Sequence, residues 1–462
     1  MAFPKRTLRL LFAVLVVASA ATLAVGYVES ERTNDRVTGD PAVEQAFRSG
    51  SDEAVVGERE NITVVATDSN AFVSDESDAP RAQAELAAFA RDGSVYYYQN
   101  DHTRYWDVDP VEGTSHTVEF VYADHLDADE CDGSVCTRNG IERVNLSTGE
   151  RTDVYSRITA DKHSTRWHDA DRIDEDRLLV ADIAQDRAFV VNTTTGLIEW
   201  SWEAQTDYSV ESGGPFPEDW THINDVEHVE VDGEEAVMVS LRNQDQVAFI
   251  DMEGRLMEEW TLGEDDDHAT LYEQHNPDFI PESEGGPALL VGDSENGRIV
   301  EYQREDGEWV ESWTWADQRM QWPRDADRLP NGHTLITDSN GDRVFEVDRE
   351  GEIVWSADVG FPYEAERLGT GDESTGGESA ASLELESHEP APQQASTRQR
   401  LQNALPPTIQ NALSYVFPRW VGLLEGLAIV VLLGSLLRWA TLEYRWLDRT
   451  ITFQSPIKLR EK

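Results

Sequence analysis

His168-Asp-Ala-Asp-Arg-Ile173 opens a unit that this 462-residue chain repeats as far as Leu368. Later copies open at His222-Ile-Asn-Asp-Val226, His275-Asn-Pro-Asp-Phe279 and Arg324-Asp-Ala-Asp-Arg-Leu329, and a truncated copy opens at Tyr363-Glu-Ala-Glu-Arg-Leu368. Each full copy continues with apolar strands and polar or glycine-containing turns, and its last strand ends at Trp200, Trp260, Trp313 or Trp355. Periods of about 40–55 residues with four short strands are typical of a β-propeller.

The truncated last copy supplies the strand that the first copy lacks. Residues 62–101 form a partial copy, because Ile62–Asn70 resembles Thr334–Asn340 without an opening strand before it. Pairing that copy with Tyr363–Leu368 closes the ring and removes an open sheet edge. The other copies open near Trp106, His168, His222, His275 and Arg324. We therefore predict an all-β fold, a six-bladed β-propeller over residues 59–368 closed by a C-terminal strand.

Apolar segments flank the propeller. Residues 8–28 and 420–440 are each apolar over about 20 residues, enough to span a bilayer, so we expect a transmembrane helix at each end. The small residues Ala18-Ser-Ala20 leave open a removed signal peptide in place of the first helix. Basic residues in the flanking segments 1–7 and 441–462 predict that both termini are cytoplasmic and that the propeller is extracellular.

The remaining segments are predicted from composition. Residues 29–58 are expected to be a linker, and residues 369–400 a disordered linker rich in Gly, Ser, Glu, Pro and Gln. Residues 401–418 are expected to form an interfacial helix along the membrane surface.

The chain is strongly acidic, with 90 acidic and 38 basic residues and a formal net charge of −52. Such an excess repels nucleic acid phosphates, so we expect no nucleic acid partner. It fits a surface adapted to high salt, where self-repulsion is screened, and so indicates a halophilic archaeon.

Two cysteines and three sequons agree with an extracellular location. Cys131 and Cys136 are expected to form a disulfide that pins a loop in an oxidising compartment. The pair alone is weak evidence for a metal site. Asn61, Asn145 and Asn192 begin Asn-X-Ser/Thr sequons and are expected glycosylation sites.

The first strand of each blade lines the axis of a propeller, so the blade-opening residues should gather at one mouth. Arg242, in a turn of the His222 blade, can reach the same place. Three imidazoles, two guanidiniums and two aromatic rings, with few acids at the centre, suit an oxyanion such as sulfate or phosphate. Two alternatives are a three-histidine metal site and histidines that only tether the Asp three residues on or pack in the core. We expect no metal and no cofactor. The set is Trp106, His168, His222, Arg242, His275, Arg324 and Tyr363.

These features resemble the arylsulfate sulfotransferase family (arylsulfotransferase, ASST-like), here in a membrane-anchored haloarchaeal form. The resemblance lies in the six-bladed plan, the histidines that open consecutive blades, and the arginine 20 residues after the middle one. It covers about residues 60–368. It implies an enzyme that moves a sulfuryl group from an aryl sulfate to a phenol by a ping-pong route through a sulfohistidine.

The resemblance also implies roles for residues at matching positions. His275 is then the nucleophile, and His222 is the residue that protonates the leaving phenolate and later deprotonates the acceptor. His168 and Arg242 hold the sulfuryl oxygens. The other substrate-binding candidates are Arg324 and the two aromatic residues expected to flank an aryl ring, Trp106 and Tyr363. The partners are small aryl sulfates and phenols together with a membrane, and the oligomeric state is left open.

Two other interpretations stay open. The first is a non-catalytic extracellular binding propeller that serves as a scaffold of the cell envelope, in which replacing the histidines changes no phenotype. The second is a quinone- or metal-dependent dehydrogenase, for which the sequence shows no acidic metal-binding motif.

Overall fold

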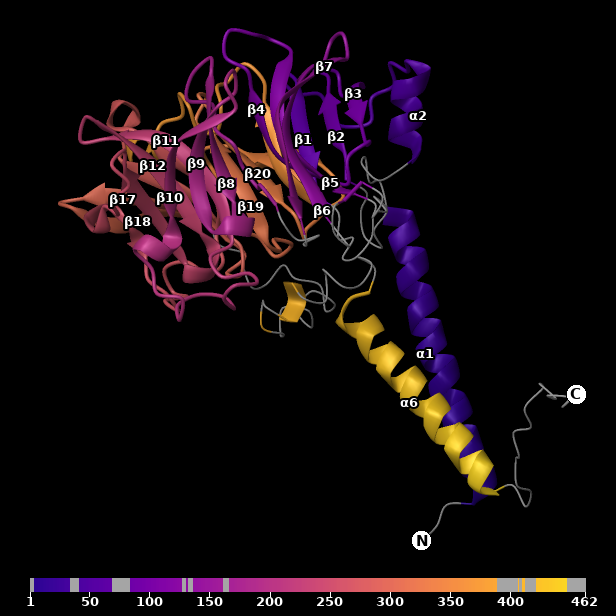
Figure 1. Ribbon diagram of the computed structural model, residues 1–462. Coiled ribbons are helices and arrows are strands. Elements are labelled where there is room, and N and C mark those ends of the chain that lie inside the picture. The colour runs from indigo at the N-terminus through magenta and orange to yellow at the C-terminus, as the bar shows by residue number, and fades with distance from the viewer. Residues whose placement is uncertain are drawn as a thin grey trace, which may run out of the picture. The chain divides into compact units, whose positions relative to one another are not determined.

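The computed structural model describes residues 4–33, 41–68, 84–126, 130–131, 136–160, 166–388, 406, 409–411 and 421–446. The chain divides into two units (Figure 1). Residues 35–418 contain the propeller, and residues 1–34 and 419–462 contain the two terminal helices. The interfacial helix predicted at 401–418 lies mostly outside the described residues.

Six antiparallel sheets confirm the six-bladed β-propeller. Blade 1 contains β23 (Pro362–Arg367), β1 (Thr63–Thr67), β2 (Leu86–Phe89) and β3 (Val95–Gln99). Blade 2 contains β4 (Arg104–Pro110), β5 (Thr117–Leu126), β6 (Cys136–Asn145) and β7 (Glu150–Ala160). Blade 3 contains β8 (Arg177–Asp182), β9 (Arg187–Asn192) and β10 (Leu197–Glu203).

Blade 4 contains β11 (Ile223–Val231), β12 (Glu234–Leu241), β13 (Gln246–Asp251) and β14 (Leu262–Gly263). Blade 5 contains β15 (His275–Ile280), β16 (Ala288–Asp293), β17 (Arg298–Glu305) and β18 (Glu308–Trp315). Blade 6 contains β19 (Pro323–Arg328), β20 (Thr334–Asp338), β21 (Arg343–Val347) and β22 (Ile353–Ala357).

The ring closes through the C-terminal strand, as predicted. β23 pairs antiparallel with β1, so that Val64 lies opposite Glu366 and Val65 lies opposite Ala365. In the described part of the chain, each of the six junctions between neighbouring blades has its own apolar cluster. The cluster between blades 6 and 1 includes Leu335 and Val65, both almost fully buried. Both faces of every sheet are therefore covered by neighbouring blades.

Blade 3 departs from the four-strand plan. Its inner segment, residues 166–173, forms only isolated bridges to β8. It still runs beside that strand, because the amide of Ala181 donates to the carbonyl oxygen of Asp169 at 3.0 Å. The segment therefore occupies the place of an inner strand.

The predicted linker at 29–58 is partly folded. Helix α2 (Pro41–Ser49) places the ring of Phe47 against blade 1, with its centroid 5.8 Å from Tyr97 and 6.5 Å from Tyr98. The amphipathic segment before the propeller therefore covers part of its first blade.

The disordered linker predicted at 369–400 is folded against the propeller over residues 369–388. Helix α3 (Ala380–Leu383) contributes Ala380, which is 1% exposed, to the cluster between blades 5 and 6. A Cβ atom at Gly377 would lie 1.8 Å from the carbonyl oxygen of Arg328. Composition predicted disorder because the segment has few large apolar residues, whereas its small residues allow close backbone contact.

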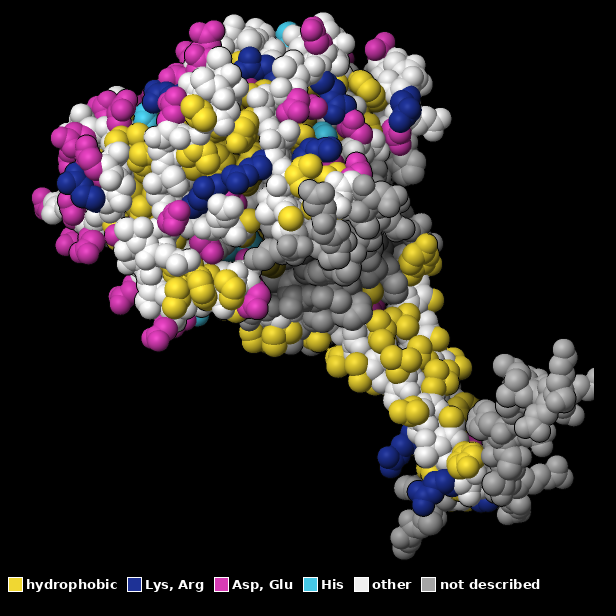
Figure 2. Space-filling view, in the orientation of Figure 1, with side chains coloured by type: hydrophobic (Ala, Val, Ile, Leu, Met, Phe, Trp, Pro, Cys, Tyr) yellow, Lys and Arg dark blue, Asp and Glu magenta, His cyan; other side chains and the backbone are white. Residues whose placement is uncertain are grey.

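The terminal unit contains α1 (Lys5–Thr33) and α6 (Leu423–Trp446). Lys5–Val28 and Leu423–Trp446, 24 residues each, are long and apolar enough to cross a membrane. Their apolar side chains are largely exposed, including Leu437 at 72%, and Figure 2 shows apolar residues along the helices and acidic residues over the propeller. The two helices pack together, with the ring of Phe12 stacked 6.3 Å from Trp439.

Candidate active site

An extra residue near the start of each inner strand directs side chains toward the propeller axis. The strand registers leave Tyr363, Asn224 and Arg324 unpaired between two matched positions in blades 1, 4 and 6. In blade 2 the extra residue is one of 106–107, and in blade 5 it is one of 276–277. In blade 3 the four residues 168–171 lie opposite the three residues 179–181, so this segment also contains one extra residue. Such β-bulges re-aim side chains and recur next to active sites. The aligned set is Trp106, His168, Asn224, His275, Arg324 and Tyr363.

His222 lies two residues ahead of the position expected from the repeat. The strand registers align Asn224, rather than His222, with His275. His222 has a φ of 50°, in the left-handed region that is uncommon for residues other than glycine. Its ring nevertheless lies 5.3 Å from the ring of His168. Blade 4 therefore reaches the site through the residue before its inner strand.

The three predicted histidines are buried together around one tyrosine. His168, His222 and His275 are 2%, 6% and 1% exposed. The ring of Tyr363 lies 5.4 Å from His168 and 6.4 Å from His275. Arg242 comes close as well, since its Nη1 lies 3.0 Å from Nδ1 of His222. The structure thus places four of the predicted side chains in one cluster about Tyr363.

The environment of His275 fixes its tautomer. Its Nδ1 lies 3.1 Å from the carbonyl oxygen of Glu273 and 2.8 Å from Oγ of Ser294. A carbonyl oxygen can only accept, and the Ser294 hydroxyl donates to the carbonyl oxygen of Pro323 at 2.7 Å. Nδ1 must therefore carry the hydrogen, which leaves the lone pair of the neutral ring on Nε2. Burial, together with Arg324 and Arg242, holds the pKa of His275 well below its ordinary value.

His222 is positioned by a carboxylate and a guanidinium. Its Nδ1 lies 2.7 Å from Oδ1 of Asp219, three residues earlier in the chain. The carboxylate contact is shorter than the 3.0 Å contact of the Arg242 guanidinium with the same nitrogen, so we assign Nδ1 as the donor to Asp219, which leaves Nε2 as an acceptor. Burial and the charge of Arg242 lower the pKa of His222 to about 4, although Asp219 opposes the shift. The ring is therefore a neutral base at pH 7.

His168 presents a buried hydrogen-bonding nitrogen. The hydroxyl of Tyr363 lies 2.9 Å from Nδ1 of His168 and 3.5 Å from the carbonyl oxygen of Asn224. The hydroxyl has one hydrogen: if Nδ1 accepts it, the ring hydrogen is on Nε2, and if the Asn224 carbonyl accepts it, the ring hydrogen is on Nδ1. That Nε2 is buried without a partner among the described residues. Trp106 stacks on the imidazole, with the ring centroids 4.9 Å apart. In the tautomer with the hydrogen on Nε2, an anion that accepts from Nε2 would satisfy a buried donor.

The two arginines lie near Trp322, a residue that the repeat pattern did not single out. The guanidinium carbon of Arg242 lies 6.0 Å from the Trp322 ring, and that of Arg324 lies 5.9 Å from it. Arg324 also lies 4.6 Å from the ring of Tyr363. Trp322 has a φ of 56° just before the inner strand, the same place that His222 takes in blade 4. The bulge shift concealed this position from sequence alignment.

Acidic residues are far more frequent at the axis than the sequence analysis expected. Their side chains form two rings around the axis. The first ring consists of the residues one position after the aligned set, and the second ring consists of the residues three positions after it. Most of these side chains are buried. The first ring is Asp107, Asp169, Asp225, Asn276, Asp325 and Glu364, and the second is Asp109, Asp171, Glu227, Asp278, Asp327 and Glu366.

Several acids of the first ring hold neighbouring blades together. Oδ2 of Asp107 accepts from the amide of Ala170 at 3.0 Å, and Oδ2 of Asp169 accepts from the amide of Val226 at 2.7 Å. Oε1 of Glu364 accepts from the amide of Val108 at 2.9 Å. The acids of the repeated motif therefore form hydrogen bonds between neighbouring blades.

The other predicted positions lie away from this cluster. A disulfide joins Cys131, in the connection between β5 and β6, to Cys136, the first residue of β6. Asn61 is exposed, and Asn145 and Asn192 are partly exposed. The amide oxygen of Asn145 accepts from the backbone amide of Ser147 at 3.0 Å, within a turn.

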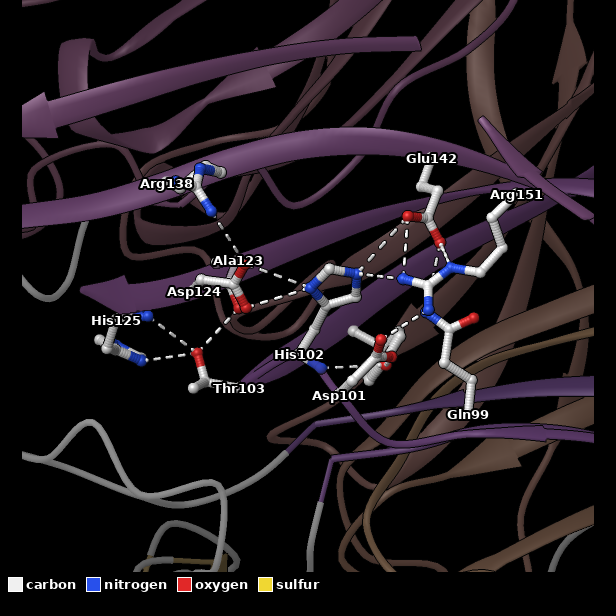
Figure 3. Close-up of polar contacts among 11 residues, drawn as sticks. Gln99, Asp101, His102, Thr103, Ala123, Asp124, His125, Arg138, Glu142 and Arg151 are labelled. Atoms are coloured by element: carbon white, nitrogen blue, oxygen red, sulfur yellow. Dashed lines mark hydrogen bonds and ion pairs between the residues drawn. The ribbon is translucent and has the colours of Figure 1, made fainter. Parts of the chain in front are cut away.

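A second histidine cluster in blade 2 is a structural network (Figure 3). Nδ1 of His102 lies 3.1 Å from Oδ1 of Asp124, and its ring stacks 3.8 Å from Tyr122. On the other side, Arg151 donates to Glu142 at 2.6 Å. Because these groups satisfy one another, the cluster ties the loop at 101–103 to blade 2.

The comparison with protein families addresses the same cluster. Residues 154–360 match the arylsulfotransferase (ASST) family model. The matched arylsulfotransferase domain contains His168, His222, Arg242, His275 and Arg324. Trp106 and Tyr363, which come from blade 2 and from the closing strand, lie outside it.

Solved structures with a similar arrangement include a protein of unknown function from Bacteroides caccae, at 13% identity and a TM-score of 0.42, covering 66% of this chain and 98% of that one. The periplasmic gluconolactonase PpgL of Pseudomonas aeruginosa has 14% identity and a TM-score of 0.42, with 67% and 99% covered. Among curated proteins, none matches the chain.

Proposed function

We propose that the propeller transfers a sulfuryl group from an aryl sulfate to a phenol through a sulfohistidine at His275. The arylsulfotransferase match of residues 154–360 supports the reaction class. The route is carried by one observation: Glu273 and Ser294 hold the hydrogen of His275 on Nδ1, so the lone pair is on Nε2. A neutral imidazole in this tautomer is a nucleophile without prior loss of a proton.

In the first half-reaction, Nε2 of His275 attacks the sulfur of the aryl sulfate. An S–N bond forms, the S–O bond to the aryl group breaks, and the phenolate leaves with the electron pair. The imidazole ring becomes cationic, and the Glu273 carbonyl and Ser294 hydroxyl that accept from Nδ1 stabilise this charge. His222 is neutral at pH 7, so this step favours donors whose phenols are acidic enough to leave unprotonated.

In the second half-reaction, His222 acts as the base. The acceptor phenol gives its proton to Nε2 of His222, and its oxygen attacks the sulfur. An S–O bond forms, the S–N bond breaks, and His275 recovers its lone pair. Asp219 stabilises the imidazolium through the hydrogen bond that it accepts from Nδ1. The proton can then pass to the phenolate or to solvent, which completes the cycle.

The cationic and donor groups bind the sulfuryl oxygens. Nε2 of His168 is buried without a partner among the described residues and is proposed to donate to the sulfuryl group, and Arg242 and Arg324 supply positive charge. Because the sulfuryl oxygens stay anionic throughout, fixed donors position the group and stabilise the transition state. Trp106 and Tyr363 are proposed to limit the aryl site while holding His168 in place.

The test is transfer from para-nitrophenyl sulfate to a phenol in high-salt buffer. We expect His275→Ala and His275→Asn to abolish release of para-nitrophenol while circular dichroism stays unchanged. His116→Ala, which removes an exposed histidine, is the matched control and should retain activity. Full activity of His275→Ala would refute the nucleophile, and an inactive wild type would favour the scaffold interpretation.

We also propose that α1 and α6 anchor the protein in the membrane with the propeller outside the cell. The two apolar helices support anchoring, and the disulfide supports an oxidising compartment. Protease treatment of intact cells should then cleave the propeller. Protection of the propeller in intact cells, with cleavage after lysis, would place it in the cytoplasm.

A further inference from the structure

Three acidic side chains of the axial rings converge at one point. Asp107, Asp109 and Glu364 each place one carboxylate oxygen within 4.8 Å of the oxygens of the other two. Asp107 and Asp109 come from β4 of blade 2, and Glu364 comes from β23, the neighbouring inner strand. They are 3%, 8% and 6% exposed. Burying several carboxylates together costs several kcal/mol each unless they are protonated or paired with a cation.

The arginines of the same motifs do not neutralise this cluster, because they are engaged elsewhere. Arg328, which follows the acids of blade 6, donates to Glu301 at 2.9 Å. Arg367, which follows Glu366 in blade 1, donates to Glu346 at 3.0 Å. Both pairs join an inner strand to an outward carboxylate, so the positive charge of the repeat is directed away from the axis.

A second observation comes from an amide that faces the cluster. In the first ring, blade 5 has Asn276 where the other five blades have an acid. Its Nδ2 donates to Oε2 of Glu364 at 2.8 Å. Its Oδ1 is buried and has no partner among the described residues, and Asn276 is 6% exposed. An amide oxygen held beside a carboxylate needs a donor or a cation.

Two other acids of the axial rings also have oxygens without a partner in the described part of the chain. Oδ2 of Asp225 and Oδ2 of Asp327 are buried without a partner among the described residues, in side chains 3% and 2% exposed. Asp225 interacts electrostatically with Glu364, although the two come from opposite sides of the ring. The axis therefore gathers oxygen acceptors, both charged and neutral, with too few donors.

We infer that this site binds a calcium ion through Asp107, Asp109 and Glu364, with the amide oxygen of Asn276 as a neutral ligand. Calcium accepts six to eight oxygen ligands in flexible geometry, whereas magnesium requires near-ideal octahedral geometry and retains water. A buried cluster of carboxylate and amide oxygens from separate blades suits the larger ion. Asn276 and Glu364 adjoin His275 and Tyr363, so the ion would also fix the floor of the histidine site.

Calcium binding can be measured without any catalytic assay. Wild-type protein dialysed against a chelator should bind one calcium ion per chain in calorimetry and should melt at a higher temperature when calcium is restored. Asp109→Asn and Glu364→Gln should weaken binding by about tenfold or more. Asp171→Asn, which removes an acid of the second ring outside the site, is the matched control and should bind calcium like wild type.

A second measurement uses wild-type protein alone, in case a variant does not fold. Terbium in the site lies next to Trp106, the neighbour of Asp107, so excitation of tryptophan should give terbium emission that calcium displaces. No calcium-dependent heat or melting shift in the wild type, or terbium emission that calcium leaves unchanged, would overturn the proposal. Equal loss of binding in Asp171→Asn would overturn it too, because the acids would then act only through their total charge.

Discussion

Nδ1 of His275 lies 3.1 Å from the carbonyl oxygen of Glu273, and this contact decides which nitrogen of the ring can react. The acceptor belongs to the backbone, so no change of side-chain protonation can reverse the tautomer. Ser294 adds a second acceptor at 2.8 Å. The reactive nitrogen is thus set by the turn that leads into the inner strand of blade 5.

Ser294→Ala should reduce kcat about tenfold and change KM little, since it removes one of the two acceptors that hold Nδ1. The matched control is Ser339→Ala. Ser339 takes the same place in blade 6 and donates to the carbonyl oxygen of Pro362 at 2.5 Å, much as Ser294 donates to that of Pro323 at 2.7 Å. Both variants should lose similar stability. Equal kcat in the two variants would show that Ser294 acts only on the fold.

The pH dependence of stability should report His222. Its pKa is about 4 in the folded chain against an ordinary value of 6.5, so the unfolded chain binds more protons between these values. The lowered pKa of His222 therefore adds on the order of 3 kcal/mol to the free energy of unfolding above pH 6.5, and this contribution is lost as the pH falls through 4. The difference in the free energy of unfolding between wild type and His222→Gln, measured with urea at each pH, should show this loss. A difference independent of pH would contradict it.

The same histidine should set the acid limb of activity. kcat/KM should fall below about pH 4, where Nε2 of His222 becomes protonated and can no longer act as base. Asp219 raises the pKa of His222, so Asp219→Asn should move this limb to lower pH. A limb that moves to higher pH would contradict the assignment.

Closure of the ring should dominate stability. The amide of Ala365 donates to Oδ2 of Asp325 at 3.2 Å, and Ala365 lies opposite Val65 in the closing pair. Ala365→Pro removes this donor in the innermost strand of blade 1, which faces the axis, and should cost about 3 kcal/mol or more, measured by urea unfolding. Ile353→Pro, at the start of the outer edge strand β22, should cost far less. Equal losses would mean that the closing strand is not critical.

Periodicity predicted the blades and their closure, because each copy repeats one strand pattern. It could not predict the bulge in the inner strand, which depends on pairing with the next strand. The repeat therefore aligned His222 with His275, whereas the strands align Asn224. Trp322 and Asp219 escaped notice for the same reason, since both lie before the inner strands.

The acidic motif was also misjudged from sequence. In a chain with 90 acidic residues, Asp169 and Glu364 look like part of a solvated surface. Both acids are buried because the inner strands lie at the axis. There the carboxylate oxygens accept hydrogen bonds from backbone amides of the next blade. Only the packed ring distinguishes these acids from the others.

The most direct measurement is mass spectrometry of the protein quenched after incubation with an aryl sulfate and no acceptor. The account predicts one sulfuryl group on the peptide that contains His275, and its disappearance when a phenol is added. Phenol release with no modified histidine, or with the group on His168 or His222 instead, would contradict a sulfohistidine at His275.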